Sequence, residues 1–376
     1  MTLRALSTAR RRRAWPAIIA IALLSAGCAY SPASLPVIEP DRYEGAKHTV
    51  IVATSRAKLD DPLLRFGDAR SDDLSFEEIE VWTPSSRKPG SVAYPSKKPK
   101  PDKEFAVLSI NPLDAETFKD TLRRRVADED SEKRVFIFVH GYNVPYANGI
   151  YRHAQLMEDF DASGVALHFS WPSSGRSLGY LYDRDSVQFA RDGLVNVLVA
   201  AGESGADTVF LMGHSMGTLL VMEALRQLNI SGQTDVIEKI RPLVLASPDI
   251  DVDVFRSQMN ALERRPDPIV VFVSQKDGAL KLSERLRGGR SRVGYGSNIE
   301  ELRENGIVVI DLSELDVGEG TNHSAFASSP ELIRALQQAN VAEVTQRSAD
   351  RPRDPMAPLN ALRDLTEGIV FLPERK

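Results

Sequence analysis

The 376-residue chain has few of the residues that build disulfides and metal centres. Cys28 is its single cysteine, so no disulfide can form within the chain and the fold must depend on its hydrophobic core. The six histidines show neither an H-E-x-x-H motif nor a paired spacing, so we expect no metal and no cofactor. The apolar stretch at residues 14–24 is too short for a comfortable transmembrane helix.

The chain also lacks an excess of positive charge. Its formal net charge of −5 argues against a general nucleic-acid binder, and we expect no nucleic-acid partner. Hydrophobic residues make up 42% of the chain and charged residues 26%, the balance of a globular protein. Because the sequence shows neither an internal repeat nor a second core, we predict a single domain over residues 47–340.

The N-terminus has the pattern of a bacterial export signal. Five arginines precede the apolar stretch, the small residues Ser25-Ala26-Gly27 and then Cys28, with no acidic residue in this segment. The pattern resembles the lipobox of lipoproteins, although Leu24 lies four residues before the cysteine, where three is usual. The resemblance implies a lipoprotein signal peptide at residues 1–27, acylation of Cys28, and a lipid anchor in the cell envelope that faces the periplasm. A secretory signal cleaved nearby and an uncleaved anchor are the alternatives.

Regular strand–helix alternation begins at residue 134 and predicts parallel strands with helices on both faces of the sheet. Three earlier strand-like stretches predict an antiparallel N-terminal edge: residues 48–56, 76–82 and 104–110. We therefore predict an α/β fold with a doubly wound, mostly parallel sheet. A Pro- and Ser-containing tether is predicted at residues 28–46, and a charged, mobile tail at residues 341–376.

The stretch Asp207–Leu228 joins a strand-like half to a helical half through Gly213-His214-Ser215-Met216-Gly217. The two glycines lack a Cβ, so strand and helix can approach closely and the serine between them is exposed on a strained turn. This is the physical basis of the G-x-S-x-G nucleophile elbow. The alternative is that Ser215 only caps the N-terminus of the helix.

The carboxyl ends of parallel strands meet at one edge of a sheet, where sites form. His140-Gly141-Tyr142-Asn143 follows the first main strand at this edge. The backbone N–H groups of Tyr142 and Met216 are predicted to form an oxyanion hole. An ordinary glycine turn is the alternative for the loop.

A serine nucleophile needs a histidine base and an acid that orients it. Only His323 follows the last strand in a Gly-rich loop that is free to aim an imidazole. Asp277 and Asp249 both follow strands and both keep the chain order Ser, Asp, His. Asp277 is the preferred acid, although it could instead cap the next helix, whereas Asp249 could cap a helix or line the pocket.

Four motifs resemble those of the α/β-hydrolase superfamily: HGYN at 140–143, GHSMG at 213–217, SQKD at 274–277 and NHSAF at 322–326. The strings FVHGYN, YRHAQL and FSWPSSG also resemble a little-characterised bacterial branch described as esterase- or lipase-like. The resemblance covers residues 48–340. It implies the α/β-hydrolase fold with Ser215 as nucleophile, His323 as base and an acid after a late strand, without deciding between Asp277 and Asp249.

Three aromatic residues follow another strand end and are predicted either to line an acyl pocket or to pack in the core: Trp171, Tyr180 and Tyr182. The sequence thus predicts a serine hydrolase that cleaves carboxylic esters, with a small acyl ester or a lipid as substrate. The alternatives are a non-catalytic envelope binding protein on the same fold and an acyltransferase. Serine at the elbow, where a carboxylate would be needed, excludes dehalogenase and epoxide hydrolase chemistry.

Overall fold

The computed structural model describes residues 33–39, 43–129, 133–286, 288–315, 322–346 and 370–371. The predicted signal peptide and Cys28 lie outside the described residues. No helix in the described part is long and apolar enough to cross a membrane.

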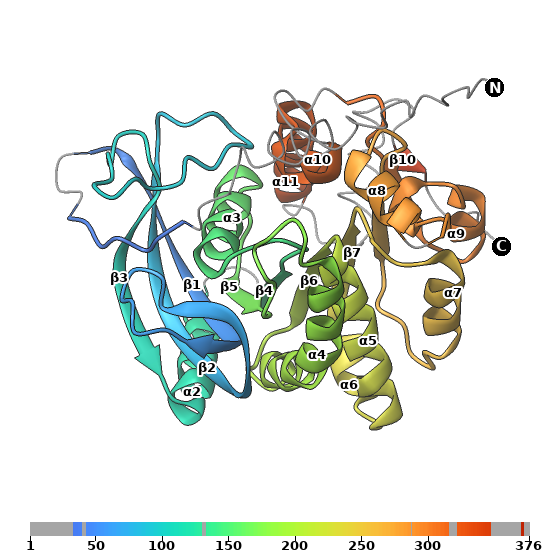
Figure 1. Cartoon of the computed structure of the whole chain (residues 1–376), viewed down its shortest axis with the longest axis horizontal. Helices are drawn as coiled ribbons and strands as arrows, with labels where there is room; N and C mark the ends of the chain where they lie inside the picture. The colour runs from blue at the N-terminus through green and yellow to red at the C-terminus, as the bar shows by residue number, and fades with distance from the viewer. Residues whose placement is uncertain are drawn as a thin grey trace, which may run out of the picture. The chain divides into compact units, whose positions relative to one another are not determined.

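A ten-stranded sheet forms the centre of the domain, in the order β10-β9-β8-β7-β6-β4-β5-β1-β2-β3 (Figure 1). Neighbouring strands from β9 to β1 pair in parallel, whereas β1–β2, β2–β3 and β9–β10 are antiparallel pairs. This confirms the predicted α/β fold with a mostly parallel sheet and an antiparallel N-terminal edge. The strands are β1 Gly45–Lys58, β2 Phe66–Pro84, β3 Ala106–Leu113, β4 Arg134–Val139, β5 Val165–Ser170, β6 Thr208–His214, β7 Ile240–Ala246, β8 Ile269–Val273, β9 Val308–Asp311 and β10 Val370–Phe371.

Helices cover both faces of the sheet because the strands are apolar on both sides, as parallel strands usually are. In β4, Ile137 belongs to the core cluster that also contains residues of α2, α4, α5, α6, α7 and α9, whereas Phe136 and Phe138 belong to a second cluster that contains residues of α3, α10 and α11. Figure 1 shows α4 and α5 side by side. The helices are α2 Ala115–Ala127, α3 Tyr146–Asp159, α4 Tyr180–Gly202, α5 Met216–Ile230, α6 Thr234–Glu238, α7 Val252–Asn260, α8 Gly278–Leu286, α9 Ile299–Glu304, α10 Ala325–Ser328 and α11 Pro330–Gln346.

Residues 33–39, which belong to the predicted tether, pack against the domain. Leu35 is buried, and its N–H donates to the carbonyl of Leu63. Ile38 N–H donates to Val107 O at 2.9 Å, so this segment runs beside β3. Ala33 and Leu35 join the core cluster that contains the apolar residues of α3, and this burial stabilises the position of the segment.

The predicted C-terminal tail lies largely outside the described residues. Where it is described, it has regular structure: α11 continues to Gln346, and β10 pairs antiparallel with β9 at the end of the sheet.

Three histidines are buried in the domain, and burial lowers the pKa of each well below its ordinary value: His140, His153 and His168. The ring centroids of His140 and His168 lie 5.7 Å apart, and those of His168 and His153 lie 5.9 Å apart. The three imidazoles are therefore neutral in the folded protein at neutral pH.

We expect the domain to lose stability as the pH falls through about 6.5. Below that pH the unfolded chain protonates these imidazoles and the folded protein does not, so each lowers the free energy of unfolding by up to about 1.4 kcal/mol per pH unit. Together with His214, whose pKa burial also lowers, they should lower it by several kcal/mol between pH 7.5 and 5.5. Urea unfolding at the two pH values measures the difference.

His153→Phe is the matched variant for this prediction. The His153 ring contacts Phe136 and Phe138, and neither of its ring nitrogens has a hydrogen-bond partner within the described structure. The variant should therefore lose part of the pH dependence, because it removes one of the buried imidazoles. Equal unfolding free energies at the two pH values in the unsubstituted protein would contradict the prediction.

Candidate active site

Ser215 is the single residue between strand β6 and helix α5. Its backbone has φ 52° and ψ −123°, a strained conformation for a residue with a Cβ. Its hydroxyl makes no capping hydrogen bond to the helix, so the structure does not support the simple helix-cap interpretation. A Cβ on Gly217 would lie 2.2 Å from the carbonyl oxygen of His140, so only glycine allows α5 to begin this close to β4.

The loop after β4 touches the elbow directly. A Cβ on Gly141 would lie 2.9 Å from the Cβ of Ser215. The N–H groups of Asn143 and Val144 are already engaged by Asp183 and by the Ser173 hydroxyl. The N–H of Tyr142 therefore remains a candidate donor of this loop, beside the first N–H of α5, which belongs to Met216.

His323 lies in a short 3₁₀ helix, Asn322–Ser324, and its imidazole meets Asp277. The Nδ1 atom of His323 lies 2.8 Å from Oδ2 of Asp277. The other carboxylate oxygen of Asp277 accepts the N–H groups of Ala279 and Leu280 at 3.0 Å each. Asp277 therefore caps α8 and orients the imidazole at the same time, because its two oxygens serve different partners.

His214 connects the histidine loop to the elbow. Its Nε2 atom lies 3.0 Å from the carbonyl oxygen of His323, and the two ring centroids are 4.9 Å apart. A carbonyl only accepts, so Nε2 of His214 carries the proton and donates it. Burial, followed by the charge of His323, holds the pKa of His214 well below its ordinary value. His214 is therefore neutral and engaged, and it ties the backbone of His323 to the residue before Ser215.

Asp249 lies beside the elbow, and its carboxylate is bound by residues other than His323. Its N–H donates to the backbone oxygen of Ser215 at 3.3 Å. Its carboxylate accepts the hydroxyls of Tyr180 and Ser283, at 2.8 and 2.7 Å, and forms a buried ion pair with Arg292 at 3.4 Å. Of the two candidate acids, the structure brings Asp277 and not Asp249 onto the imidazole.

The three candidate pocket aromatics lie in different environments. Trp171 is fully buried, stacks on His140 and donates to the His140 carbonyl at 2.7 Å, so it packs in the core. Tyr182 donates to Asp68 O and lies under the guanidinium of Arg70, on the side of β2. Only Tyr180 reaches the elbow, through Asp249.

Sequence reasoning did not find Arg56, which lies behind the loop after β4. The residue is 1% exposed, and burial lowers the pKa of its guanidinium to about 10. It donates to the carbonyl oxygens of Val144, Gly67 and Ser173 and to the hydroxyl of Ser170. The sequence signal is a cation near the end of an apolar strand, but its partners come from three other segments and cannot be predicted from that strand.

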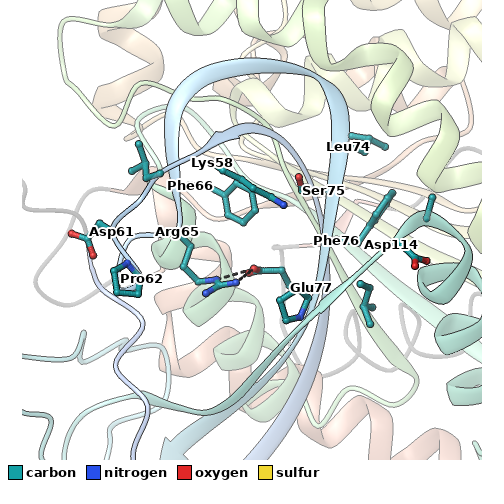
Figure 2. A pocket seen from close by; sticks show the side chains of 14 residues that line it. Lys58, Asp61, Pro62, Arg65, Phe66, Leu74, Ser75, Phe76, Glu77 and Asp114 are labelled. Atoms are coloured by element: carbon teal, nitrogen blue, oxygen red, sulfur yellow. Dashed lines mark hydrogen bonds and ion pairs between the residues drawn. The ribbon is translucent and has the colours of Figure 1, made fainter.

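Figure 2 shows a hollow that is separate from this site, between the β1–β2 hairpin and the start of α2. Arg65 pairs there with Glu77, whose other oxygen accepts the Tyr146 hydroxyl at 2.7 Å. The buried carboxylate of Glu77 is thus paired within the hollow. Among the described residues, no group of three or more His, Cys, Asp or Glu side chains is placed to hold a metal ion.

A mostly parallel sheet, a serine on a strained strand–helix turn and an Asp–His pair at the same strand ends define the α/β-hydrolase class. The chain belongs to the family described as alpha/beta hydrolase of unknown function (DUF900), whose model matches residues 114–340.

A curated relative, the uncharacterized protein alr1448 of Nostoc sp., is 27% identical over 139 residues; the match covers 30% of this chain and 36% of the relative. A protein of unknown function from Agrobacterium tumefaciens is a structural neighbour with 16% identity and a TM-score of 0.34, covering 60% of this chain and 92% of its own. Esterases from Rhizomucor miehei give 12% identity and a TM-score of 0.34, with 82% and 86% covered. At these TM-scores the likenesses do not bear on function.

Proposed function

We propose that the protein is a serine hydrolase that cleaves carboxylic esters through an acyl-enzyme at Ser215. The observation that carries the proposal is the Asp277–His323 pair. His214 binds the backbone of His323 and directly precedes Ser215, whose backbone is strained and whose hydroxyl caps no helix. A nucleophile, a base with an orienting acid, and backbone donors at a helix start are the parts that acyl transfer requires.

In this mechanism the Ser215 hydroxyl attacks the ester carbonyl, and Nε2 of His323 takes its proton. The N–H groups of Met216 and Tyr142 donate to the oxyanion. The imidazolium, stabilised by ionised Asp277, then gives the proton to the departing alcohol oxygen. Water, deprotonated by His323, attacks the acyl-enzyme, which releases the carboxylic acid and returns the proton to Ser215.

Labelling with a fluorophosphonate tests the nucleophile. The reagent forms a P–O bond with an activated serine and loses fluoride. We expect one adduct, at Ser215, located by mass spectrometry of peptides and prevented by prior heat denaturation. Ser231, at the other end of α5, serves as the internal control and should remain unlabelled. Folded protein without a Ser215 adduct would contradict the proposal and favour a non-catalytic binding protein. Product analysis with added alcohols separates hydrolysis from acyl transfer.

His214→Leu should lower kcat for a soluble ester by about 10²-fold, because a small displacement of a catalytic group costs this much. The variant removes the donor that holds the His323 backbone. His214→Gln places an amide N–H near the same position and should restore most of kcat. A purely structural role would instead give both variants equal losses that follow the fall in their unfolding free energies. Steady-state kinetics and urea unfolding of both variants decide between the two roles.

A further inference from the structure

Two leucines beside the candidate active site are exposed to solvent. Leu178 is 100% exposed and Leu181 is 79% exposed. They lie on either side of the point where the loop after β5 enters α4, which begins at Tyr180. Large apolar side chains in such positions expose area that water solvates unfavourably.

The segment that carries these leucines is hydrogen-bonded to the site. The hydroxyl of Tyr142 donates to Ser177 O, next to Leu178, at 2.6 Å. Tyr180 donates to Asp249, whose own N–H holds the backbone of Ser215. The exposed leucines therefore border the place where a substrate would approach the serine.

The N-terminal segment enters the domain near this same loop. Ala33 N–H donates to Oδ1 of Asn148, in the first turn of α3, at 3.0 Å. A Cβ on Gly175, three residues before Leu178, would lie 3.2 Å from Pro145, the residue before α3. Cys28 is five residues before Ala33, and an extended chain of that length spans at most about 18 Å.

We propose that Leu178 and Leu181 form a membrane-contact surface, occupied by the bilayer that holds the acylated Cys28. The surface presents the active site to lipids, so the substrate class is the acyl esters of membrane lipids. A second apolar contact strengthens a lipid anchor, and leucine favours the boundary between headgroups and acyl chains. The substrate assignment rests on the proposed hydrolase function, whereas the surface itself does not.

The surface is tested with mature, full-length protein purified from membranes and carrying Leu178→Cys. Acylation blocks the thiol of Cys28, so an environment-sensitive fluorophore labels position 178 alone. The protein is reconstituted in phosphatidylethanolamine–phosphatidylglycerol vesicles with doxyl-labelled lipids. Ile230→Cys is the matched control, since Ile230 is 61% exposed and ends α5 at the opposite edge of the sheet. We expect doxyl quenching at 178 to exceed quenching at 230 by at least about fivefold.

Three results would overturn the surface: equal quenching at the two positions, a fluorophore at 178 that reports contact with a second copy of the chain, or a mature Cys28 without acyl groups by mass spectrometry.

The substrate class is tested by the ratio of hydrolysis rates for a lipid ester in vesicles and the same acyl ester in water. Leu178→Asp combined with Leu181→Asp should lower this ratio by about tenfold or more, and Ile230→Asp should leave it unchanged. An unchanged ratio in the double variant would overturn the substrate class. Failure of the unsubstituted protein to cleave the soluble ester would contradict the proposed function instead, and the quenching result would still stand.

Discussion

Replacing Ser215 by alanine is expected to lower kcat/KM for soluble esters by about 10⁴-fold or more. Removing the nucleophile of a serine hydrolase leaves only the contribution of backbone donors and substrate binding. Ser231→Ala is the matched control, because that hydroxyl bonds only to carbonyls at the end of α5 and should change the rate less than about twofold. An ester hydrolysis rate retained in Ser215→Ala would show that another residue carries the reaction.

The strained backbone of Ser215 can be tested separately, through the stability of variants at this position. Glycine adopts φ 52° without a Cβ clash, and the serine hydroxyl makes no helix-capping bond that would be lost. Ser215→Gly should therefore be as inactive as Ser215→Ala but more stable than it, by about 1 kcal/mol. Thermal unfolding of the two variants measures the difference. Equal stability of the two would mean that the turn stores no strain.

Asp277→Asn should lower kcat by about 10⁴-fold while KM changes little. In the proposed mechanism, the carboxylate holds the Nδ1 proton of His323 and stabilises the imidazolium that would form during the reaction. An amide can present its NH₂ group to Nδ1, which then accepts, and the proton moves to Nε2, where the serine proton must be received. The pH-independent kcat of the variant on a soluble ester is the measurement.

Asp249→Asn is the matched control and should show the opposite pattern. Its carboxylate faces Tyr180, Ser283 and the buried guanidinium of Arg292. Neutralising it leaves a buried charge without its partner, which costs about 3 kcal/mol of unfolding free energy. We expect kcat to stay within about tenfold of the unsubstituted enzyme. A large loss of kcat in Asp249→Asn with a small loss in Asp277→Asn would assign the acid to Asp249.

The fold could be predicted from sequence because its signals are local. Strands such as Val135–Val139 are apolar on both faces, and amphipathic segments long enough to form helices follow them. A parallel sheet with helices on both faces buries both apolar faces of such strands. The packing of residues 33–38 could not be predicted in this way. Their pattern of apolar and polar residues is too short to predict a strand. Hydrogen bonds to β3 and burial in the core cluster that contains α3 stabilise their position.

The sequence by itself determined which residues are candidates for the site, namely Ser215, His323 and the two acids, because glycine spacing and strand ends are local patterns of the chain. Only the tertiary structure decided which carboxylate meets the imidazole, since Asp249 and Asp277 follow neighbouring strands with the same local pattern. It alone also revealed His214 and Arg56, whose partners come from distant segments. A hydrogen bond depends on direction and distance in space, and chain order specifies neither for residues about a hundred positions apart.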